Sequence, residues 1–312
     1  MKTLLILGLQ ILLTVCVAAE EVSITVENHD LKGTLIPSPK GKDLAVMIVS
    51  GSGPTDRDGN TTGVKGKNNS LKYLAEALHT NNIATLRCDK RGVGGSLGAG
   101  VKEEELRFDT YINDVVAWVQ FLHTKGYRKV VLLGHSEGAL VATVAAQKSN
   151  IAGLVLIAGA GRPAQDILRA QLKPQLSEKD YSRANQLLIA LSKGHQVQNS
   201  IPALHALFRP SVQPYLISWF KFDPAKELAK IKSPVLIIQG STDIQTSTQD
   251  AQKLHTEAKG SQIEIIEGMN HILKRQDGDL KAQMKSYTDP SLPLHPDLVP
   301  KLDTFIRAQV KK

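Results

Sequence analysis

Cysteine is nearly absent from this chain, which contains only Cys16 and Cys88 among its 312 residues. With a single cysteine after residue 19, a framework of internal disulfides is excluded, and the fold must rely on an apolar core. Cys88 lies in an apolar run and is expected to be a small buried residue. Metal-ligand spacings such as H-E-x-x-H or C-x-x-C are absent too, so the sequence predicts neither a metal nor a cofactor.

Concentrated charge is also missing. The formal net charge is +8, but the basic residues are scattered and do not alternate with aromatic residues. They are typical of a solvated surface, and we expect no nucleic-acid partner. Internal repeats and low-complexity tracts are absent as well, and the length is sufficient for one large α/β domain at residues 20–312.

The first nineteen residues have the pattern of a signal peptide. Lys2 precedes the apolar stretch 4–18, and small residues at 17–19 form a cleavage site before Glu20. The stretch is short for a membrane span, which needs about 20 residues. We therefore expect export to the periplasm or the extracellular space, with no membrane span in the mature chain. A retained N-terminal anchor is the alternative. Lipidation of Cys16 is disfavoured because Val15 precedes it, where a lipoprotein signal has a smaller side chain.

Apolar runs alternate with helical patterns along the rest of the chain. After a predicted hairpin at 22–37, strands are expected at 45–50, 83–89, 129–134, 153–159, 234–240 and 262–268. Helices are expected between them, which indicates a mostly parallel sheet covered on both faces. Residues 162–230 contain helical patterns but no strand, and we interpret them as a helical cap inserted above the sheet.

The stretch LLGHSEGAL at 132–140 suggests a nucleophile. It places Ser136 in a G-x-S-x-G pentapeptide between an apolar strand and an alanine-rich helix. A sharp turn there raises the serine hydroxyl above the sheet and points the first amides of the helix toward its substrate. The pentapeptide alone is weak support, and its position between strand and helix gives it weight.

A serine nucleophile needs a base and an orienting carboxylate, which follow it in that architecture in the order acid, then histidine. Asp243 and His271 each come just after a predicted strand, at the sheet edge where Ser136 emerges. Asp250 and His255 are the alternatives, but both lie in a helical stretch.

An oxyanion hole requires two further donors. We expect the amide of Glu137, directly after the nucleophile, and the amide of Ser52, in the glycine-rich loop 51–59 that follows a strand. The side chain of Glu137 is not expected to act as the triad acid. The charged residues Asp56, Arg57 and Asp58 are expected either to pair with one another and hold this loop in shape, or to be simply solvated.

A dense aromatic run lies at 207–222 in the predicted cap. One interpretation is that its rings pack the cap onto the sheet. The other is that Tyr215, Trp219 and Phe220 cover the space above Ser136 and bind substrate in a short apolar acyl pocket.

Four motifs together resemble the α/β-hydrolase fold. They are GHSEG at 134–138, DKRGVGGS at 89–96, STD at 241–243 and GMNH at 268–271, and the loop GSGPTDRDG at 51–59 is similar to that of a group of bacterial carboxylesterases often labelled serine aminopeptidase-like. The resemblance implies a Ser136–His271–Asp243 triad and an oxyanion site near Ser52 and Glu137. The chain departs from the pattern in a long extension at 274–296, which we expect to lengthen the catalytic loop and reach the pocket.

The sequence therefore predicts an exported serine hydrolase that cleaves small-molecule carboxylic esters of short to medium acyl chains through an acyl-enzyme. A peptidase or thioesterase of the same fold is the alternative within enzymes, and a catalytically inactive binding protein is the alternative outside them. The pattern makes no prediction about oligomeric state.

Overall fold

A computed structural model describes residues 18–98, 101–198 and 201–310. Most of the predicted signal peptide, with Cys16, lies outside these residues. The first strand, β1, begins at Glu20, the residue that follows the predicted cleavage site.

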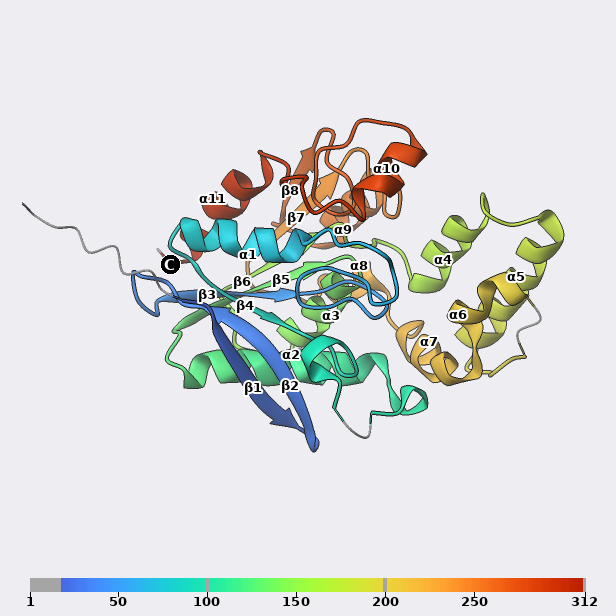
Figure 1. Ribbon diagram of the computed structural model, residues 1–312, viewed down its shortest axis with the longest axis horizontal. Coiled ribbons are helices and arrows are strands. Elements are labelled where there is room, and N and C mark those ends of the chain that lie inside the picture. The colour runs from blue at the N-terminus through green and yellow to red at the C-terminus, as the bar shows by residue number, and fades with distance from the viewer. Residues whose placement is uncertain (1–17, 99–100, 199–200, 311–312) are drawn as a thin grey trace, which may run out of the picture.

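Eight strands form one sheet in the order β1-β2-β4-β3-β5-β6-β7-β8 (Figure 1). Strands β1 and β2 make an antiparallel hairpin, β2 pairs antiparallel with β4, and all other neighbours are parallel. The strands are β1 (Glu20–Val26), β2 (His29–Ile36), β3 (Leu44–Val49), β4 (Ala84–Cys88), β5 (Lys129–His135), β6 (Gly153–Ile157), β7 (Val235–Gly240) and β8 (Gln262–Ile266). The expected mostly parallel sheet is confirmed.

Continuous apolar runs occupy the centre of the sheet because both of its faces are covered. Every residue of β3, β4, β6 and β7 is buried, whereas the edge strands β1 and β8 expose alternate or terminal positions. Cys88 closes β4 and is buried as expected.

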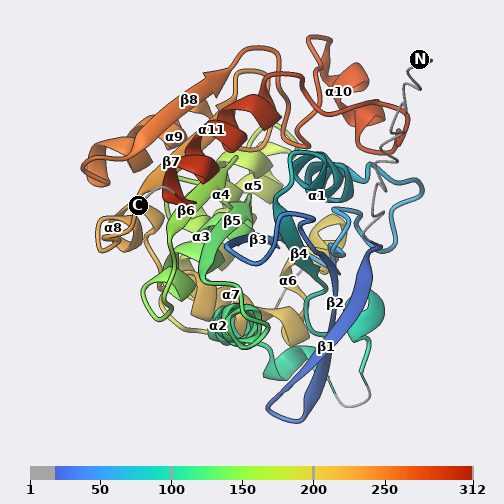
Figure 2. The same cartoon turned by 90° about the vertical axis from the view of Figure 1, so that its left-hand side faces the viewer.

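Helices cover the two faces of the sheet. On one face α1 and α11 pack their apolar sides together, and on the other lie α2, α3, α8 and α9 (Figures 1 and 2). The helices are α1 (Ser70–Thr80), α2 (Phe108–Thr124), α3 (Glu137–Ala146), α4 (Ala164–Leu172), α5 (Glu178–Ser192), α6 (His205–Phe208), α7 (Gln213–Trp219), α8 (Pro224–Leu228), α9 (Thr248–Glu257), α10 (Leu280–Ser286) and α11 (Leu298–Val310). None of these helices, within the described ranges, is long and apolar enough to cross a membrane.

The cap consists of α4 to α7, which project beyond the carboxyl ends of the parallel strands (Figure 1). It has an apolar cluster of its own, separate from the two clusters that flank the sheet. That cluster contains Ala164, Leu172, Ala184, Leu188, Leu191, Ile201, Leu204, Phe208, Leu216 and Phe220. The segment enters after β6 and returns before β7, so its packing adds a third layer above the strand ends.

Candidate active site

The turn between β5 and α3 presents Ser136. Its backbone has φ 57° and ψ −123°, a combination that is rare for a residue with a side chain and that places the serine at the tip of a sharp turn. The flanking glycines make the turn possible. A Cβ on Gly134 would lie 2.2 Å from the carbonyl oxygen of Gly138, and a Cβ on Gly138 would lie 2.5 Å from the carbonyl oxygen of Ser50. The G-x-S-x-G spacing is thus a steric requirement of this turn.

A hydrogen-bonded relay joins three side chains that lie far apart in the sequence. Nε2 of His271 is 3.1 Å from Oγ of Ser136, and Nδ1 of His271 is 2.8 Å from Oδ2 of Asp243. A carboxylate only accepts hydrogen bonds, so Nδ1 carries the imidazole proton and Nε2 is left to accept the serine proton. The structure therefore brings together the three residues expected to act as nucleophile, base and orienting carboxylate.

Four further donors stabilise the charge on Asp243. The backbone amides of Gln245 and Thr246 donate to Oδ1 at 2.7 and 3.0 Å, while Gln239 Nε2 and the Thr246 hydroxyl each donate to Oδ2 at 3.0 Å. Burial by itself would raise the pKa of Asp243, but His271 and the backbone amides of Gln245 and Thr246 overcome it and hold the pKa at about 2. Asp243 is consequently ionised wherever the relay operates.

A second histidine supports the first. His135 Nε2 is 2.7 Å from the carbonyl oxygen of His271, and the ring centroids are 5.0 Å apart. Burial, and then the neighbouring His271, lowers the pKa of His135 to about 4. His135 is therefore neutral at pH 7 and can donate to this carbonyl without placing a second positive charge beside the relay.

Ser52 and Glu137, whose amides are expected to form the oxyanion hole, line the same cavity as Ser136. Glu137 is the first residue of α3, so its N–H has no acceptor within the helix and lies at the positive end of the helix dipole. Gly51 lies close to the nucleophile, since a Cβ on Gly51 would lie 3.1 Å from Cβ of Ser136, and Ser52 is the next residue of that loop.

Contrary to the pairing considered from the sequence, the charged side chains of loop 51–59 form ion pairs with residues outside the loop. Arg57 donates to Asp89 at 2.9 Å and to Glu21 at 2.6 Å, and Asp58 pairs with Arg87. The loop is thus attached to β4 and β1 by long-range ion pairs, which a pattern of neighbouring charges cannot indicate.

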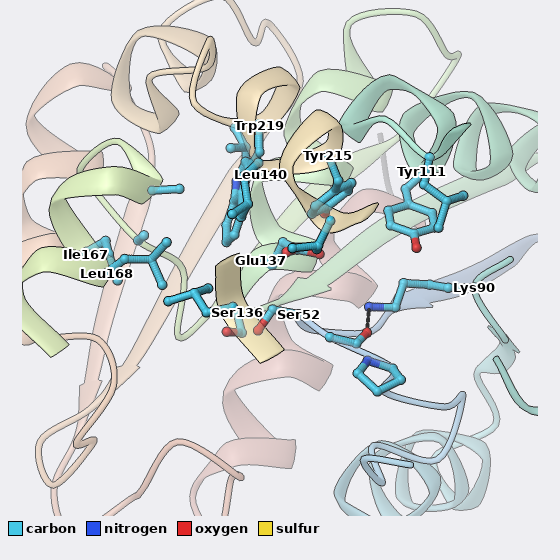
Figure 3. A pocket seen from close by; sticks show the side chains of 18 of the residues that line it. Ser52, Lys90, Tyr111, Ser136, Glu137, Leu140, Ile167, Leu168, Tyr215 and Trp219 are labelled. Atoms are coloured by element: carbon cyan, nitrogen blue, oxygen red, sulfur yellow. Dashed lines mark hydrogen bonds between the residues drawn. The ribbon is translucent and has the colours of Figure 1, made fainter. Parts of the chain in front are cut away.

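A cavity of about 610 Å³ opens above Ser136 between the sheet and the cap (Figure 3). Its apolar wall comes from α3, α4, α7 and the turn before α7. The residues of that wall include Leu140, Ile167, Leu168, Val212, Leu216 and Trp219. Tyr215 also lines the cavity, and its side chain lies beside Glu137 in Figure 3.

Phe220 does not line this cavity, contrary to the expectation from the aromatic run. It is 6% exposed and belongs to the apolar cluster of the cap. Tyr215 and Trp219 are four positions apart on α7 and share a face, whereas Phe220 is rotated by about 100° from Trp219. The extension at 274–296 likewise contributes no residue to the lining among the described residues. It reaches the cavity only indirectly, because the Tyr287 hydroxyl accepts a hydrogen bond from Nε2 of Gln245 at 3.0 Å.

Several polar side chains of the cavity were not predicted as site residues, among them Lys90, Tyr111 and the carboxyl group of Glu137. Burial raises the pKa of Glu137, and the charge of Lys90 and the hydroxyl of Tyr215 oppose this effect. Lys90 follows β4 within the DKRGVGGS motif, so its position at the carboxyl end of a parallel strand was a usable signal.

The alternative acid and base are engaged elsewhere. Asp250 is paired with Arg162 at 2.9 Å, and His255 Nδ1 is 2.8 Å from the hydroxyl of Ser261. Within residues 18–98, 101–198 and 201–310 no group of three or more His, Cys, Asp or Glu side chains is placed to hold a metal ion.

Comparison with known proteins gives a family match. The profile of the family described as serine aminopeptidase, S33 matches residues 62–276, a range that includes Ser136, Asp243 and His271. Esterase EstD of Thermotoga maritima is 28% identical over 273 residues, which are 83% of this chain and 61% of that protein. The chain therefore spans less than two thirds of the length of this relative.

Solved structures share the architecture. Est1E from Butyrivibrio proteoclasticus has a TM-score of 0.59 at 15% identity, with 94% of this chain and 99% of that chain covered. The Pyrococcus furiosus esterase Pf2001 has a TM-score of 0.59 at 17% identity, with 93% and 91% covered. At these identities the likeness concerns the fold alone, and it confirms the expected α/β-hydrolase fold.

Proposed function

Because the chain belongs to the serine aminopeptidase S33 family of hydrolases, we propose that it is a carboxylesterase that acts through an acyl-enzyme on Ser136. The observation that carries the proposal is the continuous relay of Ser136, His271 and Asp243 at the base of a largely apolar cavity. The similarity to Esterase EstD favours ester substrates.

Each group of the site has one task in this mechanism. The Ser136 oxygen attacks the ester carbonyl while His271 takes its proton and Asp243 stabilises the resulting imidazolium. The amides of Ser52 and Glu137 bind the oxyanion of the tetrahedral intermediate. The intermediate collapses and the alcohol leaves with the proton from His271. Water, deprotonated by the same histidine, then releases the acid.

The decisive measurement is hydrolysis of matched esters, amides and thioesters by the purified protein, together with labelling by a fluorophosphonate. Faster hydrolysis of the esters than of the matched amides and thioesters, with labelling at Ser136, would support the proposal. Absence of both turnover and labelling would favour the inactive binding protein.

Aminopeptidase activity is a second candidate, favoured by the description of the family. An aminopeptidase binds the ammonium group of its substrate with carboxylates. Two acidic residues, Glu103 and Glu137, line the cavity, but Glu103 is already paired with Arg209 and accepts from Ser211. A single buried carboxyl group remains, which is a weak site for a cation. Amino-acid nitroanilides in the same panel would separate the two activities.

Esters of short acyl chains should be the best substrates, because the wall of the cavity includes the bulky ring of Trp219. Trp219→Ala should shift the optimum to longer chains, since the ring covers the cavity while stacking on Phe108 at a centroid distance of 5.9 Å. An added methylene in an apolar pocket contributes ~1 kcal/mol or more, so the octanoate-to-acetate ratio of kcat/KM should rise about tenfold. A nitrophenyl ester series from acetate to palmitate measures this ratio.

Phe222→Ala is the matched control for that experiment. Phe222 also packs on Phe108, at 5.2 Å, but it is not part of the cavity lining. Its removal should leave the chain-length profile unchanged. An equal change in both variants would make Trp219 a packing residue only, and a wild-type preference for palmitate with activation at an emulsion interface would indicate a lipase.

Export is a further part of the proposal and rests on the pattern of residues 1–19. When the full chain is expressed in a bacterium with a secretion pathway, protein recovered outside the cytoplasm should begin near Glu20. Intact-mass spectrometry of that fraction tests this prediction. A chain that keeps Met1 and stays in the cytoplasm would contradict it.

A further inference from the structure

Lys90 follows the carboxyl end of β4 and lies beside the glycine-rich loop that follows β3. Its ammonium group donates to the carbonyl oxygen of Gly51 at 2.6 Å and to that of Gly53 at 2.5 Å. The same group lies 5.5 Å from the centre of the Tyr111 ring. Hydrogen bonds from an ammonium group are stronger than those between neutral groups, so the two carbonyls on either side of Ser52 are firmly held.

The first of these bonds also determines where an amide points. The carbonyl of Gly51 and the N–H of Ser52 belong to one peptide unit, which is planar and trans, so the two bonds point in opposite directions. Fixing the Gly51 oxygen on Lys90 therefore directs the Ser52 N–H away from Lys90. A Cβ on Gly51 would lie 3.1 Å from Cβ of Ser136, and Ser52 and Ser136 line the same cavity.

The second bond prevents the loop from turning about Ser52. The peptide unit after Gly53 ends in Pro54, which has no N–H and a fixed φ, and Gly53 itself has φ +68°. Two glycines around a serine form an adaptable segment with a large conformational freedom. By holding the carbonyls of Gly51 and Gly53, Lys90 removes that freedom on both sides of Ser52.

We propose that Lys90 is a positioning residue for the oxyanion hole: it holds the carbonyls of Gly51 and Gly53 and thereby aims the Ser52 amide at the oxyanion. The inference rests on the proposed esterase function. Lys90 does not contact substrate in this role, and its effect is transmitted through the loop.

Lys90→Met tests the proposal, because it keeps the length of the side chain and removes the donor. Loss of one oxyanion donor lowers kcat by roughly 100-fold, and we expect a loss approaching this value on nitrophenyl acetate with KM changed less than about threefold. Lys42→Met is the matched control, since Lys42 also donates to a backbone carbonyl, that of Lys125 at 2.7 Å, but away from the cavity. It should leave kcat unchanged.

A pair of inhibitors separates positioning from general damage. With a trifluoromethyl ketone, the Ser136 oxygen bonds to the carbonyl carbon, His271 takes the proton and the ketone oxygen becomes an oxyanion. The corresponding secondary alcohol has the same shape but forms no bond and no oxyanion. Lys90→Met should weaken binding of the ketone by about the same factor by which it lowers kcat. It should leave binding of the alcohol unchanged. Lys90→Gln, which can donate to one carbonyl, should give a kcat and a ketone affinity between those of the wild type and Lys90→Met.

The outcomes are distinguishable from failure of the proposed function. If wild-type protein neither hydrolyses esters nor reacts with a fluorophosphonate, the esterase proposal itself is wrong. If the wild type is active and both Lys90 variants keep kcat within about threefold, the role of Lys90 is wrong. Equal weakening of ketone and alcohol, or loss of the folded state in both variants, would assign Lys90 to the stability of the cavity and would also overturn the inference.

Discussion

Replacement of Ser136 by alanine is expected to lower kcat/KM for every ester by ~10³-fold or more. The reason is chemical: the Oγ atom that forms the acyl bond, and that His271 Nε2 approaches to 3.1 Å, no longer exists. The fold should be retained, because the side chain lies at the tip of a turn that its neighbours Gly134 and Gly138 determine. Esterase kinetics and a thermal melt measure the two effects.

Ser52→Ala is the matched control for this variant. The Ser52 side chain is exposed in the same cavity, but only its backbone amide has a role in the proposed mechanism, and alanine keeps that amide. Activity should remain within a few-fold of the wild type. If Ser136→Ala retained more than a tenth of the activity, or if Ser52→Ala abolished it, the nucleophile would have to be assigned differently.

Asp243→Asn should lower kcat by roughly 10³- to 10⁴-fold, although it only replaces one carboxylate oxygen with an NH₂ group. The two backbone amides that donate to Oδ1 cannot turn to accept, whereas the Gln239 amide and the Thr246 hydroxyl at Oδ2 can. The asparagine oxygen is therefore held at the Oδ1 position and its NH₂ group must face His271. The imidazole then has to accept at Nδ1 and carry its proton on Nε2. In that tautomer His271 cannot take the proton of Ser136.

The pH–rate profile and NMR measurements test this explanation. With a pKa of about 2, the wild-type carboxylate is ionised throughout the practical pH range, so protonation of Asp243 should not appear in the wild-type pH–rate profile. The imidazole ¹⁵N shifts should report the proton moving from Nδ1 to Nε2. Asp277→Asn, an exposed position on the loop that carries His271, should change neither the rate nor the tautomer. An active Asp243→Asn variant would remove Asp243 from the proposed relay.

The positions of the relay residues could be predicted because they depend on local pattern. Long apolar runs locate the buried parallel strands, and the carboxyl ends of these strands meet at one edge of the sheet. Ser136, Asp243 and His271 each follow such a run, so their proximity follows from topology rather than from any detail of packing. The strain at Ser136 and the two close glycine contacts are consistent with the pentapeptide that first indicated the site.

Features that depend on how separate segments meet were not predictable. The partners of Arg57 are distant along the chain in Glu21 and Asp89, and nothing in the loop sequence distinguishes them from neighbouring charges. The aromatic run left open which rings face the cavity, and its helical period would have separated Trp219 from Phe220 only if the bounds of α7 had been known. Lys90 was visible in a recognised motif, but its contact with two carbonyls depends on the path of another loop.

The independent apolar cluster of the cap has a consequence for how such a protein can diversify. The cap enters and leaves through one interval between β6 and β7, and its cluster contains only residues of that interval. Substitutions within α4 to α7 alter the wall above Ser136, whereas α8, in the same interval, belongs to the core of the sheet. Substrate range and catalytic chemistry are therefore encoded in separable parts of the gene, and a library restricted to codons 164–220 samples new selectivities while the chemistry stays constant.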